Sequence, residues 1–275
     1  MKKIFDDYIA DLKENDLYRE IKYFSSHQSP VSTVSGKSMM LFASNSYLGL
    51  SDDPRMIEAA CSAVRDYGTT SGGSRLTSGS YDIIHKLETE IAKWKGTESA
   101  LVFGSGFLAN IGTIKGLCGP EWSVLCDRLN HASIIDGCRA CGAEFVVYNH
   151  CDMEDLEQKI SKRKDRPCLI VTDGIFSMDG NIAPVDKISE IAKRYKALLM
   201  VDDAHASGVL GEEGAGTSEH FNLGTSVDIM MGTLSKAIAS EGGFIAGEKR
   251  LIEYIRHRAS SFIYTTAMNP ASAGA

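Results

Sequence analysis

The sequence predicts an α/β protein in which a mainly parallel sheet carries helices on both faces. Short runs of β-branched and other apolar residues recur along the chain, at 99–103, 122–126, 144–148, 168–172, 197–201 and 227–231. Amphipathic segments such as 152–163 and 185–196 separate most of these runs. Short strands that alternate with helices indicate βαβ units, and such units build a parallel sheet.

The N-terminal part of the chain precedes this pattern. We expect an amphipathic helix over residues 3–24, with an apolar face made of Ile4, Tyr8, Leu12 and, after a break, Ile21 and Phe24. A short strand is expected at 39–43.

Two more helices are expected before the first apolar run. One spans 54–67 and the other spans 81–95, because proline is favoured in the first turn of a helix and glycine just beyond its end. Pro54 opens the first of them, and Gly68 and Gly96 close the two. The long interval from 201 to 227 contains GEEGAG and predicts a loop there.

Composition excludes several functional classes. The chain has 275 residues, of which 43% are hydrophobic and 24% charged, and its net charge is −7. An acidic protein lacks the basic surface that nucleic acid requires. No run approaches the roughly 18 apolar residues of a membrane span. The first residues lack the apolar core of a signal peptide, so we expect a cytoplasmic protein.

The seven cysteines do not form a recognisable framework. Their number is odd and their spacing irregular, which favours reduced thiols over disulfides. Cys138 and Cys141 form one CxxC, but no second pair accompanies them. We therefore expect no metal site.

Polar residues follow the predicted strands, and this is the informative pattern. In an open parallel sheet, ligands bind beyond the carboxyl ends of the strands. Five strands bring glycines, hydroxyls, acids, imidazoles and one lysine to that edge: Gly104, Ser105, Gly106, Phe107, Asp127, His131, Asp173, Ser177, Asp202, Asp203, His205, Gly232, Thr233, Ser235 and Lys236.

Each of these residues, taken alone, has two interpretations, one structural and one functional. The glycines form a turn or a phosphate cradle at a helix N-terminus. Asp202 caps a helix or holds a protonated ring nitrogen. His131 packs in the core or covers a flat ring. Lys236, the only charged residue between Asp228 and Glu241, is a solvated lysine or a nucleophile.

The combination of these groups narrows the chemistry. A phosphate cradle, an acid for a pyridinium, imidazoles around a ring and an isolated lysine are what pyridoxal phosphate requires. A lysine without a charged partner in a partly desolvated site has a lowered pKa, so it acts as a nucleophile and then as a base.

Eight stretches carry a resemblance to a known family: NSYLGL (45–50), GGSRLTSGS (72–80), LVFGSGFLAN (101–110), LNHASIIDG (129–137), DGIFSMDG (173–180), VDDAHASGVLGEEGAG (201–216), GTLSKA (232–237) and SFIYTTAMNP (261–270). The chain resembles the α-oxoamine synthases among the fold-type I pyridoxal-phosphate enzymes. The resemblance implies pyridoxal 5′-phosphate as cofactor, and an amino acid and an acyl thioester, of CoA or acyl-carrier protein, as substrates.

The resemblance also implies roles around the cofactor ring. Lys236 would be the Schiff-base lysine and, with His131, a catalytic residue. Asp202 would pair with the pyridine nitrogen. His205 and Ser177 would approach the ring hydroxyl, and His131 would stack on the ring face.

Further roles concern the phosphate. Gly106 and Phe107 would offer backbone N–H groups to it, and Thr233 would contact it. Thr265 or Thr266 would reach the phosphate of a partner subunit, since the family implies a homodimer with shared active sites.

The same resemblance suggests a division of the chain. We expect an N-terminal helix and arm at 1–40, a large cofactor-binding domain at 41–255 and the start of a C-terminal region at 256–275. Arg19 would lie near the acyl substrate. The family carries a C-terminal small domain that this sequence lacks, so we expect a truncated chain.

Two other classes stay open from the residues alone. Gly104-x-Gly106-x-x-Ala109 follows a strand and Asp127 lies about 20 residues further on, which is compatible with a nicotinamide-dependent oxidoreductase. That interpretation leaves Lys236 and the segment DDAH without a role. The other alternative is an inactive fragment.

Overall fold

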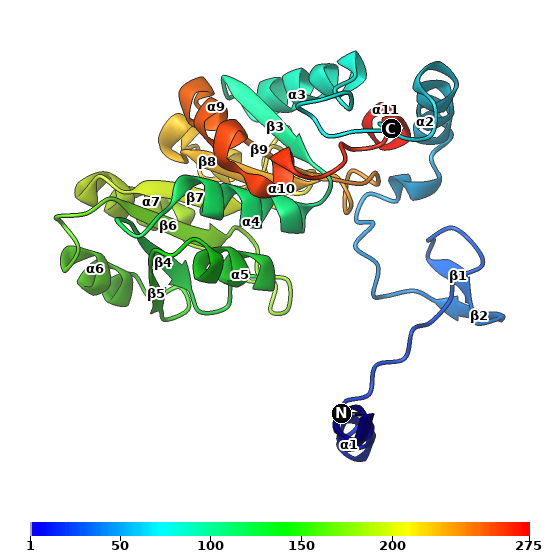
Figure 1. The fold of residues 1–275 in the computed structure, drawn as a ribbon, viewed down its shortest axis with the longest axis horizontal. Coiled ribbons are helices and arrows are strands. Elements are labelled where there is room, and N and C mark those ends of the chain that lie inside the picture. The colour runs from blue at the N-terminus through cyan, green and yellow to red at the C-terminus, as the bar shows by residue number, and fades with distance from the viewer. Residues whose placement is uncertain (1) are drawn as a thin grey trace. The chain divides into compact units, whose positions relative to one another are not determined.

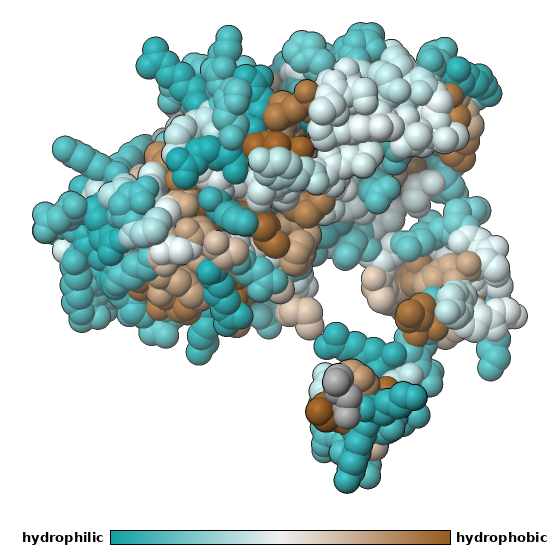
Figure 2. Space-filling view, viewed as in Figure 1, coloured by the Kyte–Doolittle hydropathy of each residue, from teal (hydrophilic) through white to brown (hydrophobic). Residues whose placement is uncertain are grey.

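The computed structural model describes residues 2–275, and the chain divides into two compact units, Met1–Ser44 and Asn45–Ala275. The first unit contains the helix α1 (Lys2–Glu14) and an antiparallel hairpin of β1 (Val31–Val34) and β2 (Lys37–Met40). It exposes apolar side chains (Figure 2), among them Ile4, Phe5, Tyr8, Ile21, Met40 and Phe42.

Two predictions for this unit are wrong. The helix expected over 3–24 ends at Glu14, because Asp16 adopts a left-handed conformation with φ 55° that a helix cannot continue through. The strand expected at 39–43 is β2, which ends at Met40 and pairs with a strand that was not predicted. Ser35 and Gly36 both have positive φ and form the two-residue turn between these strands.

The second unit is built on a seven-stranded sheet (Figure 1). Its strand order is β3-β9-β8-β7-β6-β4-β5. The strands are β3 (Ser99–Phe103), β4 (Ser123–Asp127), β5 (Glu144–Tyr148), β6 (Cys168–Asp173), β7 (Leu198–Asp202), β8 (Ile229–Thr233) and β9 (Gly243–Gly247). All run parallel except β9, which is antiparallel to both of its neighbours. The predicted α/β class and mainly parallel sheet are confirmed.

The strand β9 was missed because its sequence, GFIAG, does not resemble a strand. Glycine is depleted in strands, since it has no side chain to pack. Here close packing requires it. A Cβ on Gly243 would come within 2.5 Å of the Gly106 backbone, so the start of β9 lies directly against the first turn of α4 (Gly106–Leu117), the helix that follows β3.

Helices cover both faces of the sheet, as predicted. On one face α4, α5 (Ala132–Ala140), α9 (Lys249–Arg258) and α10 (Ser260–Ile263) pack on the sheet (Figure 1). On the other face lie α3 (Asp82–Trp94), α6 (Met153–Ser161) and α7 (Val185–Tyr195). Successive residues of one strand pack on opposite faces of the sheet, so Val124 of β4 belongs to the hydrophobic core on one face and Leu125 to the core on the other.

The remaining elements are short or peripheral. They are α2 (Pro54–Tyr67), α8 (Thr217–His220), α11 (Pro270–Gly274) and the 3-10 turns η1 (Leu50–Asp52) and η2 (Gly224–Ser226). The expected helix 54–67 is thus confirmed, and the helix expected at 81–95 is α3. Within residues 2–275, no helix combines the length and the apolar character that crossing a membrane requires.

Candidate active site

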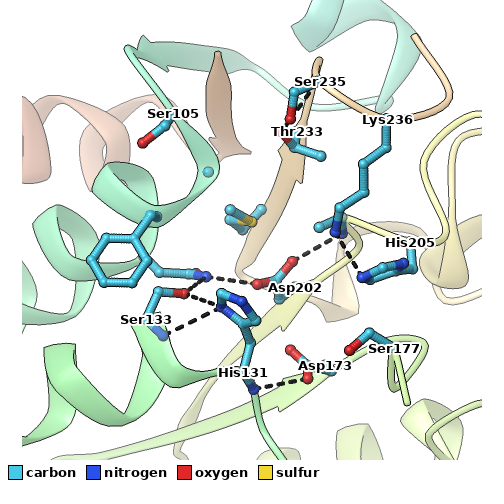
Figure 3. A pocket seen from close by; sticks show the side chains of 15 residues that line it. Ser105, His131, Ser133, Asp173, Ser177, Asp202, His205, Thr233, Ser235 and Lys236 are labelled. Atoms are coloured by element: carbon cyan, nitrogen blue, oxygen red, sulfur yellow. Dashed lines mark hydrogen bonds between the residues drawn. The ribbon is translucent and has the colours of Figure 1, made fainter. Parts of the chain in front are cut away.

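A cavity of about 210 Å³ opens at the carboxyl edge of the sheet (Figure 3). The residues that line it lie at the ends of β6, β7 and β8 or in the segments that follow β3, β4, β6, β7 and β8: Ser105, Gly106, Phe107, Asn110, His131, Ser133, Asp173, Ser177, Asp202, Ala204, His205, Met231, Thr233, Ser235 and Lys236. Eight of the eleven residues to which the family resemblance gave a role line this cavity, whereas Gly104, Asp127, Asp203 and Gly232, which were also expected at this edge, do not. The lining residues come together because parallel strands end at one edge.

Three of the residues to which the resemblance gave a role do not line this cavity. Arg19 lies in the first unit, in the non-helical segment after α1. Thr265 and Thr266 follow α10, and Thr266 forms an isolated bridge with Ser74. Because Thr265 and Thr266 were expected to serve a partner subunit, their roles and that of Arg19 stay predictions.

Lys236 lies three residues beyond the end of β8 and reaches into the cavity. Its Nζ donates a hydrogen bond to Nε2 of His205 at 2.7 Å. Burial lowers the pKa of Lys236 despite the nearby carboxylates of Asp202 and Asp173. A lowered pKa makes the unprotonated, nucleophilic amine easier to reach.

His205 connects Lys236 to the NSYLGL segment. Burial, with the charge of Lys236, lowers the pKa of His205 to about 4, so the imidazole is neutral at pH 7. Since Nε2 accepts from Lys236, the ring proton lies on Nδ1 and is donated to the Tyr47 hydroxyl at 2.6 Å. Tyr47 in turn donates to Oδ1 of Asn45 at 3.1 Å.

Asp202 ends β7 and is 4% exposed. One of its oxygens accepts from the backbone N–H of Ala204 at 2.9 Å, and the other accepts from Nδ2 of Asn110 at 2.6 Å. A carboxylate has about four lone-pair positions. Asp202 therefore retains the capacity to accept a hydrogen bond from a ligand in the cavity.

A second carboxyl lies beside Asp202. Asp173 ends β6 and pairs in register with Asp202 on the adjacent strand. Burial and the charge of Asp202 raise the pKa of Asp173 to about 9. The Asp173 carboxyl therefore keeps its proton at neutral pH. Asp173 also accepts from the backbone N–H of His131 at 3.0 Å, which holds the start of α5.

His131 caps α5 and stands over the cavity. Its Nδ1 lies 2.7 Å from Oγ of Ser133 and accepts from the Ser133 backbone N–H at 3.3 Å. The ring meets Phe107 edge-on, with centroids 6.4 Å apart. The imidazole is thereby held at the cavity mouth with its Nε2 free of these contacts.

The first turn of α4 forms the other end of the cavity. Ser105 caps the helix by accepting from the Leu108 N–H at 3.2 Å. Gly106 is tightly surrounded, because a Cβ there would lie 3.0 Å from the side chain of Met231 and 3.4 Å from that of Thr233. Unpaired N–H groups and the dipole of a helix N-terminus attract anions. The hydroxyl of Ser235 lies 2.8 Å from that of Thr233, which donates its own hydrogen to the Gly242 carbonyl at 2.8 Å, so Ser235 adds a further donor at this end.

Sequence reasoning gave no role to Asn110 and Ser133, which line the cavity, or to Tyr47, which binds the cavity residue His205. Asn110 and Ser133 were not singled out, and Tyr47 was quoted only within its motif. Asn110 had a usable signal, since it is a poor helix former placed four residues after Gly106 and so on the same helix face. Tyr47 had none, because its partner His205 is 158 residues away.

Comparison with known proteins identifies the family. The sequence matches the family described as Aminotransferase class I and II over residues 37–275. An 8-amino-7-oxononanoate synthase of Lysinibacillus sphaericus is 48% identical over 262 residues, covering 95% of this chain and 67% of that protein. The 8-amino-7-oxononanoate synthase 2 of Bacillus subtilis (strain 168) is 49% identical over 265 residues, covering 96% and 68%.

Solved structures agree with this assignment. A structure of SPT with PLP has a TM-score of 0.93 at 31% identity, covering 99% of this chain and 70% of that one. The 8-amino-7-oxononanoate synthase of Francisella tularensis has a TM-score of 0.71 at 30% identity, covering 85% and 65%. The chain belongs to the aminotransferase class I and II family, and within it to the pyridoxal-phosphate-dependent enzymes of the α-oxoamine synthase type.

Proposed function

We propose that this protein condenses L-alanine with a pimeloyl thioester, of CoA or of a carrier protein, to give 8-amino-7-oxononanoate, carbon dioxide and the free thiol. This is an early reaction of biotin synthesis. The names of relatives at 48% and 49% identity support the choice of substrates. The observation that carries the proposal is Lys236, a lysine of lowered pKa held by a neutral imidazole inside a cavity with an anion-binding end.

The residues present fit pyridoxal phosphate. Gly106, Phe107 and Thr233 would hold the phosphate at the start of α4, where a Cβ on Gly106 would crowd the cradle. Asp202 would accept from the ring nitrogen, and His131 would cover the ring. The buried Oδ1 of Asn110, which has no partner among the described residues, is consistent with a polar ligand in this cavity.

The residues of the chain then act on the substrates. Bound in this cavity, the cofactor supplies an aldehyde for an amine and a ring that withdraws electrons from the amino-acid α-carbon. Lys236, whose Nζ reaches into the cavity, would accept the α-proton of alanine. Asp202 stabilises positive charge on the ring nitrogen. His131 holds the alanine carboxylate or the acyl oxygen.

The overall reaction balances with the uptake of one proton from solvent, because the α-proton of alanine supplies only one of the two protons that the thiolate and the α-carbon take. A bond forms between the alanine α-carbon and the thioester carbonyl carbon, and the thiolate leaves and takes a proton. The carboxylate leaves as carbon dioxide, and the α-carbon is reprotonated.

The assembly and the location of the protein are part of the proposal. We propose a cytoplasmic homodimer in which Thr265 or Thr266 reaches the partner's phosphate and Arg19 approaches the acyl chain. Cross-linking and analytical ultracentrifugation of the cofactor-loaded chain test the dimer.

The first experiment is a visible absorbance spectrum of the 275-residue chain with pyridoxal phosphate, followed by borohydride reduction and peptide mapping. We expect a new absorption band and a reduced label on Lys236. A label confined to surface lysines would contradict the proposal.

The second experiment compares substrates. Thiol release from pimeloyl-CoA is measured with alanine, and release from acetyl-CoA with glycine, the pair that glycine C-acetyltransferase would use. Faster turnover of the first pair supports the proposed substrates. Faster turnover of the second pair would assign the alternative activity while keeping the cofactor chemistry.

A further inference from the structure

Asn110 occupies an unusual position for an amide. It lies in the second turn of α4, is 1% exposed and lines the cavity. Asparagine is a poor helix former, so its presence here points to a requirement for the side chain. Nδ2 donates one hydrogen to Asp202 at 2.6 Å and the other to Oγ of Ser133 at 2.9 Å. The amide thus joins three elements, α4, β7 and α5.

The orientation of this amide follows from its partners. A carboxylate oxygen only accepts hydrogen bonds, so Asp202 requires the NH₂ end of Asn110. The opposite orientation would place two oxygens 2.6 Å apart. Because both amide hydrogens are then used, Ser133 receives one of them and its oxygen acts as an acceptor toward Asn110.

The same logic extends from Ser133 to His131. Since Ser133 Oγ accepts from Asn110, its own hydrogen is free to be donated to His131 Nδ1 at 2.7 Å. The backbone N–H of Ser133 also points to this nitrogen, at 3.3 Å. With two donors directed at it, Nδ1 is an acceptor, so the proton of the neutral ring lies on Nε2.

We propose that Asn110 and Ser133 are positioning residues that link Asp202 to His131 and set the tautomer of His131. The amide aims the Asp202 carboxylate, and the hydroxyl keeps the His131 proton on Nε2. His131 then presents an N–H donor to a substrate carboxylate or thioester oxygen. The catalytic role of this arrangement rests on the proposed function. The direction of each hydrogen bond from Asn110 through Ser133 to His131 does not, because it follows from the chain's own side chains.

The tautomer is measured directly in the chain without added cofactor. Two-bond ¹H–¹⁵N correlation spectra of ¹⁵N-histidine-labelled protein distinguish Nδ1–H from Nε2–H, and His131→Gln identifies the signals of His131. We expect Nε2–H in the unsubstituted chain and a partial shift toward Nδ1–H in Ser133→Ala, because alanine removes the hydroxyl donor but keeps the backbone N–H that faces Nδ1 at 3.3 Å. A proton on Nδ1 in the unsubstituted chain, or an unchanged tautomer in Ser133→Ala, would overturn the proposal.

A matched control lies on the same helix. Thr113, three residues after Asn110, is fully buried and its hydroxyl has no partner among the described residues. Thr113→Val should leave the His131 tautomer and the circular dichroism spectrum unchanged. A shift in the tautomer of this variant equal to that in Ser133→Ala would show a general packing effect and would sink the assignment.

The second arm uses the cofactor-loaded chain. In Asn110→Ala, kcat should fall about 10- to 100-fold because Asp202 loses a charged hydrogen bond, while KM for alanine changes by less than about threefold. An equal loss in Thr113→Val would contradict a specific role. If the unsubstituted chain takes no label on Lys236, the proposed function fails, yet the spectra without cofactor still decide the tautomer.

Discussion

Lys95 and Lys236 lie near the adjacent acids Asp203 and Asp202, and their surroundings differ. Lys95 is 5% exposed, donates to Ser207 Oγ at 2.8 Å and to the Ala215 carbonyl at 2.7 Å, and lies over the Trp94 ring. Lys236 has a hydrogen bond to His205 and faces a cavity.

The acids differ in the same way. Asp203 is 1% exposed, and both of its oxygens accept from Thr217, at 2.7 and 3.0 Å. Asp202 retains acceptor capacity toward the cavity. Burial lowers the pKa of Lys95 to about 8, so a shifted pKa by itself does not identify a reactive lysine. The two sites differ because Lys236 and Asp202 face a cavity that a ligand can enter, whereas Lys95 and Asp203 are enclosed by protein groups.

The largest expected effect on turnover comes from replacing Lys236 with alanine. Lys236→Ala should remove the borohydride-stable label and lower turnover by about a thousandfold or more, because it deletes the nucleophile and base. Its free energy of unfolding should change by less than about 1 kcal/mol, since the side chain is only partly buried. Substantial turnover in this variant would refute the mechanism.

Lys95→Ala should show the opposite profile. The label on Lys236 should persist, while urea denaturation should reveal a loss of about 2–4 kcal/mol, because a buried side chain and two hydrogen bonds are removed. If Lys95→Ala abolished the label in a folded chain, the distinction between the two sites would be wrong.

Replacing the two acids with asparagine should change the reaction rate less than Lys236→Ala does, but it compares two adjacent positions directly. Asp202→Asn should still bind the cofactor but slow exchange of the alanine α-proton about 100-fold, since an amide stabilises ring charge poorly. Asp203→Asn should leave the exchange rate within about threefold and instead destabilise the fold by about 1–3 kcal/mol. Proton NMR in D₂O measures the exchange. Equal rates in the two variants would remove the role given to Asp202.

The smallest expected effect is the pH dependence of stability that arises from Lys95. The folded chain releases this proton near pH 8, whereas the unfolded chain keeps it up to the ordinary lysine pKa of 10.5. Between these values the unfolded state binds more protons, so stability should rise with pH, by at most about 3 kcal/mol. The unfolding free energy of the unsubstituted chain, minus that of Lys95→Met, should increase from pH 8 to 10.5. A flat difference would show that Lys95 titrates normally.

Much of the fold was predictable because its signal is local. The runs at 99–103 and 144–148 coincide with β3 and β5, and the helix at 54–67 coincides with α2. Apolar periodicity and helix-end residues decide such elements. The errors at the N-terminus and at β9 have causes that apolar periodicity does not show. They are the left-handed Asp16, the two-residue turn at Ser35 and a strand whose glycines serve packing.

The sequence by itself determined the α/β class, the residues at the strand ends and, through its motifs, the family and the cofactor chemistry. Only the tertiary structure decided how those residues pair. Asn110 reaches Asp202 across 92 positions and Tyr47 reaches His205 across 158. The physical reason is that hydrophobic periodicity is written into neighbouring residues, whereas hydrogen-bond partners depend on strand order and helix docking. The tautomer of His131 and the state of Lys236 are therefore properties of the assembled cavity.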